Sequence, residues 1–208
     1  MKKTTINLLA GATIALTFAA CSSKSLTINH ENELAEANKC QVLKYKEKEA
    51  CYGKISDTNS YAMIRTAVKA GQRKNHTKAL EYFTKAKNLG NYHANLGEAF
   101  IYFKGLGVKK DPTKAAMILE QAADKSPNSA FQLSRFYLKG DGVKADIPKG
   151  MKLLEQSANA GLYSSQKKLY TIYKNGEFGM TKDLEKANAW KKMYSEGKRK
   201  YFLEAYKY

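Results

Sequence analysis

The sequence predicts an all-α solenoid of about four helix-turn-helix repeats, and two observations carry this prediction. The string YFKGLGVKKDPTKA at 102–115 returns as YLKGDGVKADIPKG at 137–150 and as YKNGEFGMTKDLEKA at 173–187. The apolar residues that follow each copy recur at helical spacing. A short repeated unit of this kind cannot bury its apolar face alone, so its copies must stack against one another.

Each copy contains the residues that a tight corner between two helices requires. Gly105 and Gly107 follow Tyr102 by about one turn, and only glycine readily takes the positive φ that ends a helix and redirects the chain. Asp111 then offers an N-cap acceptor, and Pro112 suits the first turn of a second helix. The later copies repeat this order with Gly140, Gly142 and Asp146, and with Gly176, Gly179 and Asp183.

The pattern Tyr-x-x-Gly-x-Gly-Val-x-x-Asp-x-x-Lys-Ala resembles the Sel1-like repeat, a relative of the tetratricopeptide repeat. The resemblance covers about residues 58–197 and implies a right-handed α-solenoid. The strings at 102, 137 and 173 belong to copies two, three and four, and a degenerate copy one precedes them. Copy one has Thr66 in place of the tyrosine, and copy four has one more residue between its glycines. In copy two, Leu96 and Gly97 offer an alternative register two residues earlier.

The first 21 residues have the order of a bacterial lipoprotein signal peptide. Two lysines precede an apolar run from Ile6 to Phe18, which is short for a membrane span and typical of an export signal. The following residues resemble a lipobox, which implies that Cys21 is acylated. Ser22 implies sorting to the outer membrane of a Gram-negative cell, facing the periplasm. The alternative is a secreted protein that is cleaved after Ala20.

Five segments are expected on this basis, and the stacked repeats form a continuous core that requires no second domain. They are the signal peptide 1–21, a polar tether 22–30, an N-terminal cap 31–57, the repeat array 58–197, and a basic C-terminal capping helix 198–208.

Cys40 and Cys51 are the other two cysteines, and an exported protein enters a compartment that oxidises thiols. In one continuous helix their sulfurs would lie roughly 16 Å apart along the axis, beyond the reach of a disulfide. A bond between them therefore requires a break in the helix, expected within 44–49. The alternative is a continuous helix from about 32 to 52 with thiols that are free or separately paired.

Motifs of catalysis are not found. His30, His76 and His93 are not spaced as metal ligands, and the glycine corners lack the GK[ST] of a phosphate-binding loop. We therefore expect no catalytic residue, no metal and no cofactor. The formal net charge is +17, but an exported protein does not routinely meet nucleic acid. Anionic head groups or an acidic protein are the expected partners, and most lysines serve as solubilising surface.

In tetratricopeptide-like arrays the first helix of each pair lines the concave side, so the resemblance implies a groove for a protein partner. Helical spacing places the positions six before, two before and one after each repeat tyrosine on this side. The expected groove residues are Leu96, Phe100, Phe103, Phe131, Arg135, Leu138, Lys167, Thr171 and Lys174. The groove would be apolar in the middle and basic toward the C-terminus. The alternative register would instead place Leu96, Phe100 and Phe103 in the core.

The predicted function is a non-enzymatic, protein-binding scaffold that is anchored in the outer membrane and faces the periplasm. The resemblance leaves two alternatives open. One is a neutralising (immunity) partner of a secreted antibacterial toxin. The other is a cell-wall or penicillin-binding enzyme of the cysteine-rich Sel1-like type, which fits less well because such proteins have a cysteine pair in each repeat and copies two to four here have none.

Overall fold

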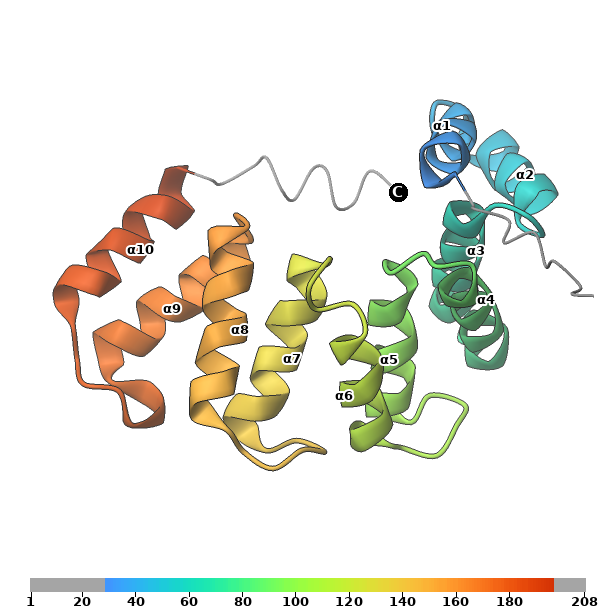
Figure 1. Ribbon diagram of the computed structural model, residues 1–208. Helices are drawn as coiled ribbons and strands as arrows, with labels where there is room; N and C mark the ends of the chain where they lie inside the picture. The colour runs from blue at the N-terminus through green and yellow to red at the C-terminus, as the bar shows by residue number, and fades with distance from the viewer. Residues whose placement is uncertain (1–28, 197–208) are drawn as a thin grey trace, which may run out of the picture.

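The computed structural model describes residues 29–196, and this part of the chain is entirely helical, as the sequence predicts (Figure 1). The predicted signal peptide, most of the tether and the predicted closing helix at 198–208 lie outside the described residues. The helices are α1 (His30–Gln41), α2 (Tyr45–Ile55), α3 (Ser60–Gln72), α4 (His76–Asn88), α5 (Ala94–Lys104), α6 (Pro112–Glu120), α7 (Pro127–Lys139), α8 (Ile147–Asn159), α9 (Tyr163–Asn175) and α10 (Leu184–Glu196), with a short 3-10 turn η1 (Glu177–Gly179).

The helices from α3 to α10 form four antiparallel pairs that follow one another in an arc, and α1 and α2 lie at the α3 end (Figure 1). The core runs between the pairs as a series of apolar clusters. Leu133, Leu154 and Leu169 are almost completely buried in it. Close approach depends on small residues: a Cβ atom on Gly97 would lie 2.2 Å from the ring of Phe83 on the preceding helix.

The corners of the three pairs from α5 to α10 are closed by the same backbone hydrogen bond. The amide of Asp111 donates to the carbonyl of Tyr102 at 2.8 Å, and the aspartates of the next two copies repeat this bond with Tyr137 and Tyr173. The Asp111 carboxylate then accepts the amide of Lys114 at 2.8 Å as the N-cap of α6. The three tyrosines therefore occupy equivalent positions, and the register based on Tyr102 is correct for copy two.

The corners of successive repeats also contact one another. The hydroxyl of Thr113, at the start of α6, donates to the carbonyl of Gly142 in the next corner at 2.8 Å. Gly142 has φ +73°, and a Cβ atom there would lie 2.4 Å from the backbone of Pro112. Glycine at this position thus permits both the left-handed backbone and the close approach of two repeats.

Copies one and four depart from this corner. In copy one a shorter loop, residues 73–75, joins α3 to α4, and the amide of Asn75 donates to the carbonyl of Ala70 at 2.9 Å. In copy one, Lys74 takes the positive φ of 61° that glycine takes elsewhere. In copy four the additional residue is accommodated by η1, in which Phe178 has φ 56°. The ring of Phe178 packs against the apolar cluster between α8 and α9, and this burial offsets part of the strain of its backbone conformation.

Lysine side chains also lie over the rings of the repeat tyrosines. Lys149 lies 4.3 Å from the ring centre of Tyr137 and donates to Glu120 of the preceding repeat at 2.8 Å. The hydrogen bond to Glu120, and after it the one to Tyr137, holds the pKa of the Lys149 ammonium group above its usual value. Lys114 lies over Tyr102 in the same way, so this surface contact recurs along the array.

The N-terminal cap contains the predicted disulfide between Cys40 and Cys51, whose Cα atoms lie 5.5 Å apart. The helix breaks at residues 42–44, two residues before the predicted range begins, so the continuous helix from 32 to 52 is excluded. A closed loop of this length stabilises the folded cap by about 3 kcal/mol.

The cap docks on the array through a buried apolar cluster, in which Tyr61 and Ala62 of α3 pack against cap residues, and through side-chain hydrogen bonds. The hydroxyl of Ser60, at the start of α3, donates to Glu33 at 2.6 Å, and the side-chain amide of Asn59 donates to Glu36 at 2.8 Å and to the Glu33 carbonyl. Asn59 and Ser60 are buried, so these bonds satisfy polar groups that would otherwise lack a partner.

Replacing Gly142 with alanine should destabilise the array more than the same change at Gly161. Both glycines have positive φ, but a Cβ atom at Gly161 meets nothing within 4 Å. We expect Gly161→Ala to cost about 1–2 kcal/mol for the backbone conformation alone, and Gly142→Ala to cost clearly more because it also collides with Pro112. Unfolding in urea, followed by circular dichroism, measures both. Equal costs would show that the contact between corners contributes nothing.

Candidate functional site

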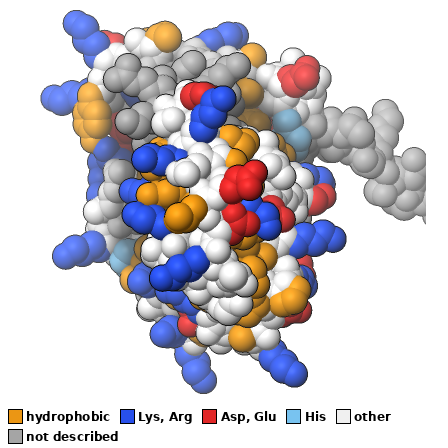
Figure 2. All heavy atoms as spheres, turned by 90° about the vertical axis from the view of Figure 1, so that its left-hand side faces the viewer, with side chains coloured by type: hydrophobic (Ala, Val, Ile, Leu, Met, Phe, Trp, Pro, Cys, Tyr) orange, Lys and Arg blue, Asp and Glu red, His pale blue; other side chains and the backbone are white. Residues whose placement is uncertain are grey.

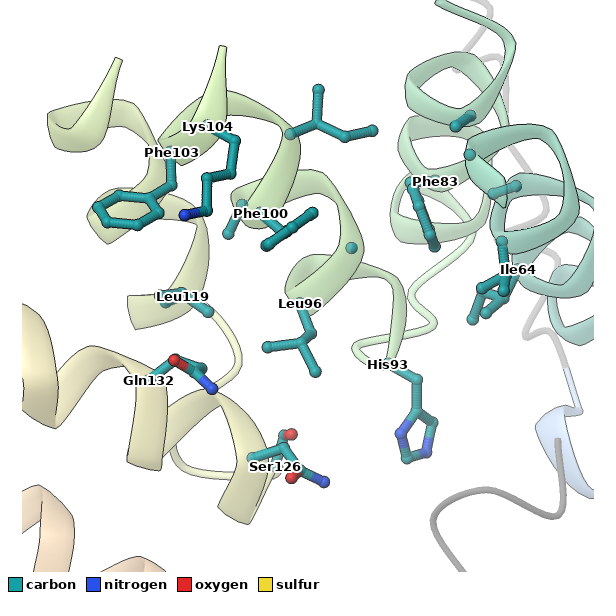
Figure 3. A pocket seen from close by; sticks show the side chains of 18 of the residues that line it. Ile64, Phe83, His93, Leu96, Phe100, Phe103, Lys104, Leu119, Ser126 and Gln132 are labelled. Carbon is teal, nitrogen blue, oxygen red and sulfur yellow. The ribbon is translucent and has the colours of Figure 1, made fainter. Parts of the chain in front are cut away.

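An open groove of about 1030 Å³ lies along the first helices of three successive pairs, α3, α5 and α7 (Figure 3). Its walls also include residues of the connections that precede α5 and α7. The helical repeat explains this position, because the first helices of stacked pairs lie next to one another on one side of the array. We call this hollow the concave groove.

Apolar side chains form the middle of the concave groove. Phe100 of α5 is the most exposed of them, with 53% of its surface accessible. Leu96 and Phe103 line the groove on the same helix but are partly buried against the cluster between α5 and α7. The ring of Phe103 lies 5.0 Å from that of Phe136. Leu96 and Phe103 therefore belong to both the groove and the core, whereas Phe100 faces the open space.

The charged side chains of the concave groove are mostly basic. Arg65, Lys104, Lys125 and Arg135 line it, and Asp141 is the carboxylate among the lining residues. The guanidinium of Arg135 donates to Gln132 at 2.8 Å, which orients it along α7. The groove thus combines an apolar floor with a positive border.

Aromatic rings lie at the end of the concave groove near the cap. The ring of His93 lies 4.3 Å from that of Tyr92 and 6.1 Å from that of Tyr61, and His30 of α1 lies against the other side of Tyr61. Burial, and to a smaller extent the neighbouring His30, hold the pKa of His93 below its usual value. The imidazole of His30 is within 3.2 Å of Glu33.

Five residues predicted for the groove lie elsewhere, and one of them, Thr171, is half-buried on α9. Leu138 is a core residue with 5% exposure, and Phe131 packs against the same cluster, between α7 and the next repeat. The positions that correspond to them on α5 are Leu96 and Phe103, which line the groove. Lys167 and Lys174 are exposed on α9, beyond the end of the groove.

Sequence reasoning missed the contribution of α3 and one side of α7. Ile64 and Val68 of α3 line the groove, and Val68 is 42% exposed. Copy one has no repeat tyrosine, so no marker placed these residues. Gln132 of α7 lies beside Arg135 on the side that faces α5, and the apolar pattern of α7 carried no sign of it (Figure 3).

At the α10 end of the array, lysine and arginine side chains project on several sides, with acidic side chains between them (Figure 2). Lys174 of α9 lies 5.5 Å from the ring centre of Tyr170. The described surface at this end therefore shows mixed charge and no continuous basic extension of the concave groove.

Within residues 29–196, no group of three or more His, Cys, Asp or Glu side chains could hold a metal ion. In the same part of the chain no helix combines the length and apolar character that a membrane span requires. The buried carboxylate of Glu98 forms an ion pair with Lys87 at 2.8 Å on the α4 side of α5.

Together, the paired helices and the open concave groove define an α-solenoid of helical repeats. A profile of the Sel1 repeat matches residues 60–91, 92–126, 127–162 and 171–190. The chain therefore belongs to the Sel1 repeat family, and the resemblance inferred from the repeated Tyr, Gly and Asp pattern is confirmed.

Solved structures support the same fold. A Sel1 repeat protein from Oxalobacter formigenes is similar with a TM-score of 0.70 and 26% sequence identity, over 79% of this chain and 68% of that chain. A protective antigen present in uropathogenic Escherichia coli strains has a TM-score of 0.65 and 19% identity, over 80% of this chain and 38% of that chain, and this likeness concerns the fold alone. The comparison with curated proteins found no match.

Acid should weaken the junction between cap and array through His93. Because the folded pKa of His93 lies below its unfolded value of 6.5, the unfolded chain takes up the proton first as the pH falls. The contribution to stability is complete above this pH and is lost as the pH falls through the folded pKa. We expect the unfolding free energy to decrease between roughly pH 7 and pH 5, and His93→Gln to reduce this slope. If the unfolding free energy of His93→Gln fell with pH as steeply as that of the wild type, the pH dependence would not come from His93.

Proposed function

We propose that this protein is a scaffold that binds a protein partner in the concave groove and does not act as an enzyme. Sel1 repeat folds are generally protein-interaction scaffolds. The observation that carries the proposal is the exposure of Phe100 in the middle of a large groove. An exposed aromatic side chain surrounded by apolar neighbours is typical of the residues that contribute most to a protein interface.

The partner that fits this groove presents apolar side chains together with acidic ones. The apolar side chains would pack on Phe100 and Val68, which are already partly exposed. Carboxylates would approach Arg65, Lys104 and Arg135 at the border. Such complementarity chiefly accelerates association and excludes basic partners, while the apolar contacts provide most of the affinity.

We further propose that the scaffold works on the periplasmic side of the outer membrane, attached through an acylated Cys21. The support is the order of the first residues: lysines, an apolar run, small residues and a cysteine. An anchor of several acyl chains would hold the protein stably at the membrane, since a single chain binds only marginally.

Phe100→Ala should weaken capture of the partner by about thirtyfold, the effect of losing a central aromatic contact. Phe100 is largely exposed, so the melting temperature should change little. Met117→Ala is the matched control, because Met117 on α6 is 61% exposed but does not line the groove.

The measurement begins with a photoreactive amino acid at position 100 or 117, used to cross-link and identify proteins of the cell envelope. Affinity of the identified partner is then measured for both alanine variants. The groove proposal fails if position 117 cross-links the same partner as efficiently, or if Met117→Ala loses as much affinity as Phe100→Ala.

Cys21→Ser should prevent acylation, because only a thiol at this position can accept the diacylglycerol. The variant is expected to be soluble in the periplasm or to remain unprocessed. Fractionation of the cell envelope, with mass analysis of the N-terminus, tests this. Wild-type partitioning of the serine variant with outer membranes would contradict the anchor and would leave the groove proposal unaffected.

A further inference from the structure

A second surface lies at the first two corners of the array and adjoins the concave groove, because Lys110 lies 6.0 Å from the ring centre of the groove residue Phe103. It consists of the basic side chains of the α3–α4 and α5–α6 corners and of the first turns of α4 and α6. All of them are exposed. We call this surface the corner patch, and its members are Arg73, Lys74, Lys78, Lys109, Lys110 and Lys114.

The corner patch is continuous although it comes from two repeats. A Cβ atom on Gly107, in the second corner, would lie 3.2 Å from the Cβ atom of His76 at the start of α4. The corners that join α5 to α6, α7 to α8 and α9 to α10 all lie along one edge of the array, the lower edge in Figure 1. The patch is therefore the N-terminal half of this edge.

The charge of the corner patch is poorly neutralised. Asp111 lies within it, but its carboxylate already caps α6 by accepting the amide of Lys114 at 2.8 Å. Glu81 lies near Lys78 and pairs with Lys85 at 2.6 Å. Among the described residues, no member of the patch forms an ion pair. In the later corners, by contrast, Lys149 pairs with Glu120 at 2.8 Å and Lys186 with Asp183 at 3.3 Å.

The opposite edge of the array lacks this excess. Its connections, 56–59, 89–93 and 121–126, contain the acids Asp57 and Asp124 and one lysine, Lys125. The adjoining last turn of α4 adds Lys85 and Lys87, which are paired with Glu81 and Glu98. Lysines that served solubility alone would be distributed over both edges with acids among them. The concentration of cations on one edge therefore indicates an anionic partner on that side.

We propose that the corner patch docks the array on the surface of an anionic lipid bilayer. Lysine ammonium groups are compact charges on flexible stems, which suits phosphates that move within a membrane plane. None of the large apolar side chains that are exposed in the described residues belongs to the patch, so it lacks the anchors of a protein interface. It also presents no exposed aromatic platform for unpaired bases. Attraction to anionic lipid then positions the array with one edge on the membrane, and the concave groove remains accessible beside it.

Binding of vesicles to the full chain carrying Cys21→Ser tests the proposal without a contribution from acyl chains. The patch variant combines Arg73→Gln, Lys109→Gln and Lys110→Gln. The control variant removes the same charge from exposed lysines of α8 and α10 by Lys152→Gln, Lys191→Gln and Lys192→Gln. Co-sedimentation is measured with vesicles of phosphatidylcholine alone and with vesicles containing phosphatidylglycerol.

We expect binding to the phosphatidylglycerol vesicles that weakens with salt, because each lost cation near an anionic surface reduces partitioning by about fivefold. The patch variant should bind about a hundredfold more weakly, and the control variant should bind nearly as well as the parent chain. Equal losses in the two variants, or equal binding to neutral vesicles, would overturn the proposal. Tighter binding to polyglutamate or to a DNA duplex than to the vesicles would assign the patch to another polyanion and would also overturn it.

Discussion

The hydrogen bond from an aspartate amide to the carbonyl of a repeat tyrosine closes the corners of the three pairs from α5 to α10, and most of the array depends on it. It joins the last turn of the first helix to the residue directly before the second helix. It therefore sets the direction in which the second helix of the pair runs back. The aspartate side chain then caps that second helix. One residue thus ends the corner and starts the helix, which explains why the Tyr, Gly and Asp order is so regular in the sequence.

Because the corners fix each pair, the packing between pairs decides where the array is open. Between α7 and α9 the apolar side chains of Phe131 and Leu138 fill the space. Between α5 and α7 the corresponding space stays partly open, and Phe100 remains exposed there. The concave groove therefore reflects which side chains fill equivalent spaces, within a fold that otherwise repeats.

Most of the fold could be predicted from the sequence because the repeat expresses backbone requirements, and these are local. Positive φ at Gly142 and the cap at Asp146 follow from residue type and spacing alone. The groove was harder to predict, because burial depends on how the side chains of neighbouring pairs fill the space between them, which no local pattern encodes. Leu138 and Phe103 hold equivalent positions in the repeat, yet one is core and the other lines the groove. In copy one, where Thr66 replaces the tyrosine, the pattern could not place Ile64 and Val68 at all.

The disulfide-closed cap has a consequence for assembly. Every inner pair of the array offers one face to the pair before it and another to the pair after it, so an uncovered first pair would present a surface shaped to receive a last pair. Contacts of that kind join molecules head to tail, into closed rings or, where the rotation does not close, into filaments. The helices α1 and α2 cover α3 with a surface held by Glu33, Asn59 and Ser60. The cap therefore covers the surface through which another molecule could stack on the first repeat.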